Sequence, residues 1–219
     1  MPKTILDRRF FQFLVELRFN NERPWFQARK ERYQAEVQAP FLKLVETLTP
    51  KLQAVNPAYT EPKAFRIYRD TRFSHDKSPY KSHVAAQWRH RAALGDVHAP
   101  GFYLHLEPGE CYAGGGLWSP DADALAAVRK RIARRDPQWL AIQKQGMPLW
   151  DQDSLKRPPK GWRDDHPMIQ DLKRRHFITW VDLRDQAVCG PQAVKKIIQA
   201  FERSNPLIVF LNQCLHLRS

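Results

Sequence analysis

The sequence predicts an α+β protein in which N-terminal helices, a central and mainly antiparallel sheet, and C-terminal helices packed on that sheet form a single domain over residues 1–219. Apolar residues recur at helical spacing up to about residue 60 and again from about residue 119. Between about 64 and 118 they alternate with polar residues, and turn residues separate the alternating runs. With 42% hydrophobic residues among 219, the chain can bury one sizeable core.

The N-terminal helical part, about 1–60, begins with one amphipathic helix. Four apolar residues at helical spacing define it, namely Phe10, Phe13, Leu14 and Leu17. Pro24 fits the first turn of a second helix, which Pro40 should break or kink. The helix that follows should end at Pro50, and residues 51–63 should form a loop.

The central sheet, about 64–118, is expected to hold four strands. They are predicted over residues 65–69, 82–90, 102–107 and 110–117. The third has the clearest pattern, because Phe102, Leu104 and Leu106 alternate with polar residues. A helix over 80–91 is the alternative to the second strand.

The C-terminal helical part, about 119–219, should begin with a helix that Ser119 caps and Pro120 opens. Cations in the last turns of that helix suit the negative end of its dipole, so they need no ligand to explain them. The elements expected after it are a short helix over 137–145, an extended basic loop over 146–163, a helix over 165–175, a strand over 177–183, a helix from Pro191 and a last helix from Pro206.

The formal net charge of +13 and the pI of about 9.9 favour acidic partners, namely nucleic acid, phosphorylated small molecules or an anionic membrane. Three cysteines, Cys111, Cys189 and Cys214, are far apart and odd in number, which suits a reducing cytoplasm. Charged residues interrupt the apolar positions near the N-terminus, whereas a signal peptide needs a continuous apolar segment there. The apolar run 207–211 is too short to cross a bilayer. We expect a cytoplasmic protein that does not bind membranes, and the sequence leaves the oligomeric state open.

Cations and aromatic residues are interleaved between residues 64 and 81. The cations are Arg66, Arg69, Arg72, Lys77 and Lys81. Arginine presents a planar fork of donors that matches phosphate and carboxylate oxygens, so the cluster predicts a site for a phosphorylated or carboxylated small molecule. Asp70 and Asp76 are expected to orient the guanidinium groups. The other interpretation is a structural network of salt bridges, and the residue types alone fit both.

A second group of polar residues follows from strand alternation. Tyr103, His105 and Glu107 fall on the face opposite the apolar residues of their strand, and they are candidate groups for general acid–base catalysis. A pocket rim is expected from the neighbouring strand and from the basic loop, at His83, Arg89, Lys156 and Arg157. The alternative is a solvated face, which is common in antiparallel sheets.

No cofactor and no metal site are expected, because the chain lacks HExxH, CxxC, GxGxxG and GxSxG patterns. The glycines 114–116 are not followed by the Lys-Ser/Thr pair of a phosphate-binding loop, so they should permit a bulge or a close backbone approach. Whether the protein is an enzyme stays open.

RNA or single-stranded DNA is the alternative ligand. Residues 63–91 contain eight Lys or Arg against two Asp, with aromatic residues among them. Single strands bind to such combinations of stacking rings and cations. No RNP, zinc-finger or helix-turn-helix signature supports the alternative further.

The motif Arg66-x-x-Arg69-Asp70-x-Arg72-Phe73-x-x-Asp76-Lys77-x-x-Tyr80 resembles the signature of a bacterial family of conserved hypothetical proteins, domain of unknown function 2461. Segments 10–26, 99–108, 114–116 and 156–161 are similar to other parts of that family, so the resemblance covers nearly the whole chain. It implies membership of the family and brings no established activity with it.

Overall fold

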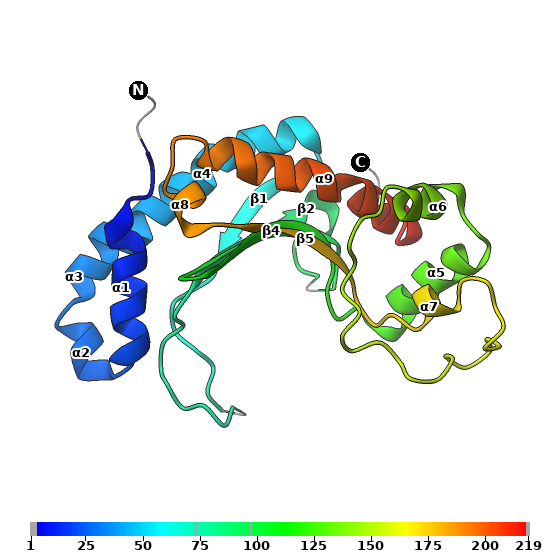
Figure 1. The fold of residues 1–219 in the computed structure, drawn as a ribbon, viewed down its shortest axis with the longest axis horizontal. Helices are drawn as coiled ribbons and strands as arrows, with labels where there is room; N and C mark the ends of the chain where they lie inside the picture. The colour runs from blue at the N-terminus through cyan, green and yellow to red at the C-terminus, as the bar shows by residue number, and fades with distance from the viewer. Residues whose placement is uncertain (1–3, 73, 97, 218–219) are drawn as a thin grey trace.

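A computed structural model describes residues 4–72, 74–96 and 98–217 and confirms the predicted fold class. Its centre is an antiparallel sheet whose five strands lie side by side in chain order (Figure 1). The strands are β1 (Tyr59–Ala64), β2 (Val84–His90), β3 (Gly101–Glu107), β4 (Glu110–Leu117) and β5 (Phe177–Leu183). The predicted strands at 82–90, 102–107, 110–117 and 177–183 are therefore present.

The N-terminal part folds into helices, as predicted. They are α1 (Arg8–Phe19), α2 (Arg23–Gln27), α3 (Lys30–Tyr33), the π-helical turn η1 (Gln34–Gln38) and α4 (Ala39–Val55). The expected end at Pro50 is wrong, because α4 continues through it to Val55. Pro50 has no amide N–H, so the carbonyl of Glu46 loses its helical hydrogen-bond partner. Both residues are exposed, whereas Leu48 and Leu52 continue the buried stripe of the helix. Burial of that stripe outweighs the missing hydrogen bond.

The first strand begins earlier than expected. Residues 51–63 are not a loop, since they complete α4 and form β1, and residues 65–69 are not a strand. Pro62 lacks a backbone N–H, and β1 tolerates it because an edge strand pairs with a neighbour on one side only. After Phe65 the chain leaves the sheet, and an isolated bridge between Tyr68 and Tyr80 closes the base of the resulting loop.

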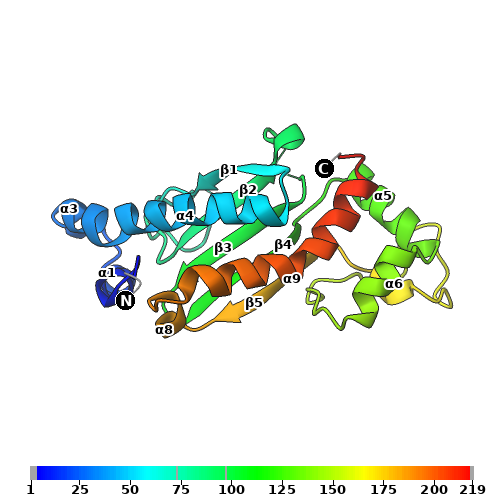
Figure 2. The ribbon, with the colours of Figure 1, turned by 90° about the horizontal axis from the view of Figure 1, so that it is seen from above.

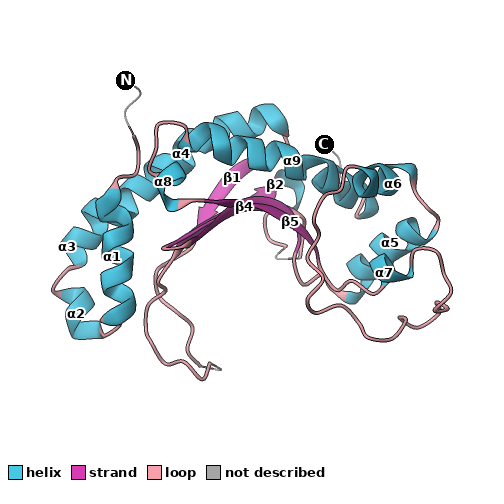
Figure 3. Ribbon diagram, in the orientation of Figure 1, coloured by secondary structure: helices cyan, strands magenta, loops and turns pink. Residues whose placement is uncertain are grey.

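Helices α4 and α9 (Ala193–Cys214) lie side by side on one face of the sheet (Figures 1 and 3). The alternation of β2 and β3 explains this arrangement, because Trp88, Phe102 and Leu104 point to that face and are fully buried. Phe201 of α9 packs edge-on against both aromatic rings, at centroid distances of 5.3 and 5.4 Å. Burial of such large apolar side chains is the main source of stability for the fold.

The predicted helix start at Pro206 is also wrong, because Pro206 lies inside the single helix α9. Figure 2 shows that this helix bends along its course, as a proline in a helix interior requires. Leu207, Ile208 and Leu211 follow the proline and are fully buried, so the packing of the helix on two cores holds the bent segment helical.

Three of the C-terminal helices, α5 (Ala122–Ala133), α6 (Pro137–Lys144) and α7 (Ile169–Leu172), form a smaller layer beside the sheet (Figure 1). The short helix α8 (Asp185–Val188) lies at the opposite end, where α9 begins, and a 3-10 turn, η2 (Arg91–Ala93), follows β2. The helix predicted over 165–175 is reduced to α7. Asp121 rather than Ser119 caps α5, since the Asp121 carboxylate accepts a hydrogen bond from the amide of Ala124 at 2.8 Å. Residues 146–163 form the expected extended loop.

Within the part of the chain that the structure describes, no helix covers the second face of the sheet. In Figure 1 it faces downward, between the loop that joins β1 to β2 and the loop that follows α6. Within residues 4–72, 74–96 and 98–217, no helix has the length and apolar character needed to cross a membrane.

Candidate functional site

The open face of the sheet forms a groove of about 950 Å³. Six aromatic side chains line it, namely Phe65, Tyr103, Tyr112, Trp118, Trp150 and Trp180. Polar groups between them come from Gln87, Arg89 and Asp182. The combination of many rings with a few polar groups is typical of a small-molecule site.

The glycine run of β4 shapes the floor of this groove. A Cβ atom on Gly114 would lie 2.1 Å from the backbone oxygen of Thr179 in β5, so only glycine permits the observed approach of the two strands. Gly116 has φ = +143°, which side chains rarely tolerate. The prediction of a close backbone approach is confirmed, and the glycines also leave the floor free of side chains.

Ring contacts run along the groove from one end to the other. His105 stacks on Tyr112 with ring centroids 4.7 Å apart, and the ring of Tyr112 is 5.8 Å from that of Trp180. Trp180 is 5.5 Å from Trp150, which contacts Trp118 at 6.3 Å. Sequence reasoning missed the three tryptophans, although Trp180 and Asp182 alternate with apolar residues in β5 as the side chains of a half-open strand do.

The predicted acid–base residues lie together at one end of the open face. The Tyr103 hydroxyl is 3.2 Å from Nδ1 of His105, and Nε2 of His105 is 3.3 Å from Oε2 of Glu107. His83 joins them, with Nδ1 3.7 Å from the same carboxylate oxygen. The strand register accounts for this, because Val84 of β2 pairs with Leu106 of β3 and the preceding His83 therefore lies across from Glu107.

Burial and hydrogen bonding set the charges of this group. Burial lowers the pKa of His83 to about 4 and also lowers the pKa of His105, although Glu107 opposes the shift in both. Burial raises the pKa of Glu107, but hydrogen bonds from Ser82 and His105 outweigh it and hold that pKa below its usual range. At neutral pH the two imidazoles are therefore neutral and the carboxylate is ionised.

The predicted cation cluster divides into two parts. On the loop, Arg72 pairs with Asp70 at 2.7 Å, Arg69 pairs with Asp76, and the Lys77 ammonium donates to the backbone oxygen of Thr71 at 3.0 Å. A hydrogen bond from Arg72 lowers the pKa of Asp70 to about 2, and hydrogen bonds from Ser78 and then Arg69 do the same for Asp76. The structure thus contains the expected orienting carboxylates. Phe73 of the motif lies outside the described residues.

The other part of the cluster lies beside Phe65, a residue of the groove wall. Lys81 is half-buried, and its ammonium lies 5.4 Å from the centroid of the Phe65 ring. Burial, followed by the charges of Arg66 and Arg69, lowers the pKa of Lys81. Among the described residues, neither Lys81 nor Arg66 forms a salt bridge with a carboxylate. These two cations are therefore close together without a directly paired counter-charge.

The expected rim is present in part. Arg89 lines the groove and donates to Gln87 and to the backbone oxygen of Leu94. Lys156 and Arg157 are exposed and do not line it, since the basic loop contributes Trp150 and Gln152 instead.

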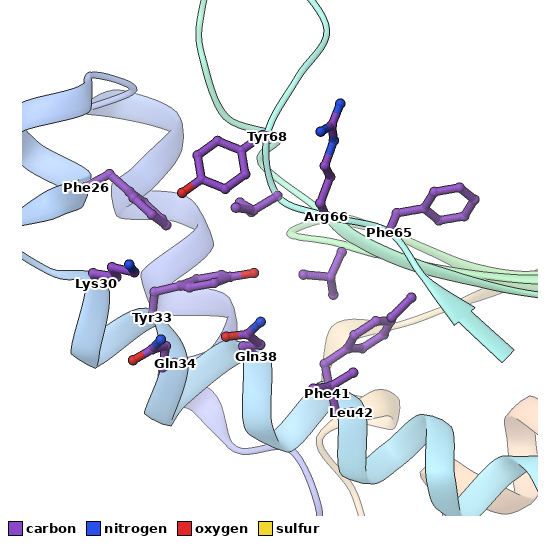
Figure 4. Close-up of a pocket in the computed structure, with 13 residues that line it drawn as sticks. Phe26, Lys30, Tyr33, Gln34, Gln38, Phe41, Leu42, Phe65, Arg66 and Tyr68 are labelled. Carbon is purple, nitrogen blue, oxygen red and sulfur yellow. The ribbon is translucent and has the colours of Figure 1, made fainter.

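A smaller pocket of about 370 Å³ lies behind Phe65, between the N-terminal helices and residues 64–68 (Figure 4). Its walls are mainly apolar, with Phe26, Tyr33 and Phe41 among them. Arg66 lies at its edge, and Figure 4 shows the guanidinium pointing away from Tyr33. The pocket therefore offers little to a charged ligand, and the groove remains the candidate site.

The fold and the groove define an α+β protein with an antiparallel sheet, helices on one face and an aromatic site on the other. Residues 9–210 match the family described as "Conserved hypothetical protein (DUF2461)", so the chain belongs to this family. No curated protein and no solved structure gives a significant match.

Proposed function

We propose that the protein binds an anionic small molecule in the groove on the open face of the sheet. The anionic group is a phosphate or carboxylate held by Arg66 and Lys81, next to Arg69, which pairs with Asp76, and the remainder of the ligand lies on the aromatic rings beyond Phe65. The observation that carries the proposal is the position of Lys81, a half-buried ammonium beside two guanidinium groups and without a carboxylate partner among the described residues.

This arrangement is unfavourable in the empty protein. Partial burial penalises the charged form of Lys81, and Arg66 and Arg69 repel it. A bound phosphate or carboxylate reverses both effects, since it supplies the opposite charge and accepts hydrogen bonds from the guanidinium of Arg66. Binding of an anion beside Lys81 therefore relieves a charge repulsion that the empty protein contains.

The groove also has the size that such a ligand needs. Its volume of about 950 Å³ lies at the upper end of the range usual for ligand pockets, roughly 300–1,000 Å³. Tyr103 and Tyr112 of the groove wall contact His105. A ligand there therefore lies next to the neutral His105 and the ionised Glu107, which suit proton transfer. We extend the proposal to the cytoplasm as location, because Cys111, Cys189 and Cys214 are all free thiols.

A thermal-shift panel tests the proposal. Inorganic phosphate, pyrophosphate, nucleoside monophosphates and aromatic carboxylates are added to the wild type, to Lys81→Gln and to Lys195→Gln. Lys195 is an exposed lysine of α9, on the covered side of the sheet, and provides the matched loss of one charge. A ligand that binds the native state raises the melting temperature. The rise should appear in the wild type and the control and be much smaller in Lys81→Gln, and equal shifts in all three proteins contradict the proposal.

A single-stranded nucleic acid is the second candidate. It is favoured by the exposure of Trp118, 56%, at the far end of the run of rings, where successive bases can stack. Binding of a fluorescent oligonucleotide should then weaken steeply as salt is added, because counterions are released on binding. Loss of affinity in Trp118→Ala, with the wild-type salt slope retained, supports this candidate, and unchanged affinity counts against it.

A further inference from the structure

We propose that His83, His105 and Glu107 bind a divalent transition-metal ion at the end of the groove. The three residues each present one ligand atom, and these atoms all lie within 4.8 Å of one another. The site goes beyond the anion site, because none of its three ligands is a cation of that site and it forms without them.

The spacing fits a metal ion without movement of the strands. Nε2 of His105 lies 3.3 Å and Nδ1 of His83 lies 3.7 Å from Oε2 of Glu107. Ligand atoms bound at about 2.0–2.2 Å to a tetrahedral zinc ion are about 3.3–3.5 Å apart. Both distances to Oε2 are thus close to those around a bound ion. The two imidazole nitrogens lie within 4.8 Å of each other and approach by side-chain rotation when an ion binds.

Neighbouring groups orient the carboxylate. Oε1 of Glu107 accepts hydrogen bonds from the Ser82 hydroxyl at 2.7 Å and from Arg18 at 2.9 Å. Oε2 is left facing the two histidines. Such outer contacts fix ligand geometry in metal sites, and their loss usually costs about 10–100-fold in affinity.

Neighbouring groups also fix the imidazole of His105. Its Nδ1 is paired with the Tyr103 hydroxyl at 3.2 Å, so Nε2 is the nitrogen available to an ion. The ring is held between Tyr112, at a centroid distance of 4.7 Å, and His83, at 4.4 Å. A metal-coordinating imidazole that is held on both sides loses little conformational freedom when a metal ion binds.

The donor set indicates the class of metal. Two imidazole nitrogens and one carboxylate oxygen suit zinc or ferrous iron, whereas magnesium and calcium prefer oxygen ligands alone. Three protein ligands leave at least one coordination position for water or for a ligand in the groove. Motif searches miss the site because His83 and the His105-x-Glu107 pair come from opposite sides of the β2–β3 pairing.

Titration with cobalt chloride tests the proposal, since Co²⁺ accepts zinc ligand sets and its visible absorption reports coordination. The full chain is stripped with EDTA and titrated in a non-coordinating buffer. We expect a saturable band at one ion per chain that zinc chloride abolishes. His105→Gln and Glu107→Gln should lose the band, Ser82→Ala should weaken binding about tenfold, and His75→Gln, an exposed loop histidine, should leave it unchanged.

Two results overturn the proposal. One is a wild-type titration without a saturable band, and the other is a band of equal affinity in the wild type and in His105→Gln. Because the first of these uses only the wild type, an unstable variant does not remove the test. The anion proposal is tested separately through Lys81→Gln, which should retain the cobalt band.

Discussion

Oε2 of Glu107 lies 3.3 Å from Nε2 of His105, while its other carboxylate oxygen accepts from Arg18 and Ser82. One side chain of β3 thereby connects α1, the approach to β2 and the polar face of the sheet. Its removal should affect both the stability of the fold and the chemistry of the groove.

The substitution Glu107→Gln should lower the free energy of unfolding by about 1–3 kcal/mol, because the carboxylate of Glu107 accepts hydrogen bonds from charged and partly buried donors. Urea denaturation measures the change. Glu46→Gln is the matched control, since Glu46 pairs with Lys43 on an exposed helix surface and its loss should cost less than about 0.5 kcal/mol. Equal costs for both variants contradict the role assigned to Glu107.

Stability should fall on acidification through the range between pH 6.5 and pH 4. The pKa of His83 is about 4 in the folded protein and 6.5 for an unperturbed histidine, so the unfolded chain binds a proton in this range that the native state does not. The contribution of this one group is at most about 1.4 kcal/mol per pH unit. The stabilisation that the lowered pKa of His83 provides is complete above pH 6.5 and is lost as the pH approaches 4.

Melting temperature as a function of pH measures this effect. His83→Gln should show a flatter profile between pH 4 and 6.5 than the wild type, and His75→Gln, whose side chain is exposed, should follow the wild type. The lowered pKa values of Asp70 and Asp76 act at lower pH, as they protonate near pH 2 in the folded protein. An unchanged profile in His83→Gln would falsify the assignment.

Gly114→Ala should destabilise the protein by about 1–3 kcal/mol or more, because the new methyl group meets the backbone oxygen of Thr179 and would force β4 and β5 apart. Gly95→Ala is the control, since a Cβ atom there has nothing within 4 Å. Thermal denaturation of the two variants should separate them by several degrees, and coincident melting curves refute the packing argument.

Thr49→Val should cost about 1–3 kcal/mol, because it leaves the indole NH of the fully buried Trp88 without its acceptor at 2.9 Å. The shape of the side chain is retained, so the cost reports the hydrogen bond and not a cavity. Thr47→Val removes an equivalent hydroxyl of the same helix that donates only to the backbone oxygen of Lys43. Its unfolding in urea should stay close to that of the wild type.

Strand alternation was sufficient to predict the faces of β2 and β3, because a period of two residues is a local property of extended backbone. That is why Tyr103, His105 and Glu107 could be assigned to one polar face from the sequence. His83 was likewise expected at the rim of this face, but its position directly across from Glu107 depends on the pairing register of two strands and could not be read from either one.

The errors at Pro50 and Pro206 have one cause. The expectation that a proline ends a helix counts the loss of one backbone hydrogen bond. Burial of the apolar stripe around Leu52 or Leu207 stabilises the helix by more than that loss. The division of the cation cluster was also beyond sequence reasoning, since Lys81 faces Phe65 only because the loop returns to the sheet beside β1. Its assignment as a ligand site remains a prediction.

Pro62 has a consequence for assembly. It removes an amide donor from the middle of the outermost strand, and the charged, exposed Glu61 and Lys63 flank it. An incoming strand would find an interrupted row of hydrogen-bond donors along this border. We therefore expect that neighbouring molecules do not extend the sheet through β1 into a continuous intermolecular sheet.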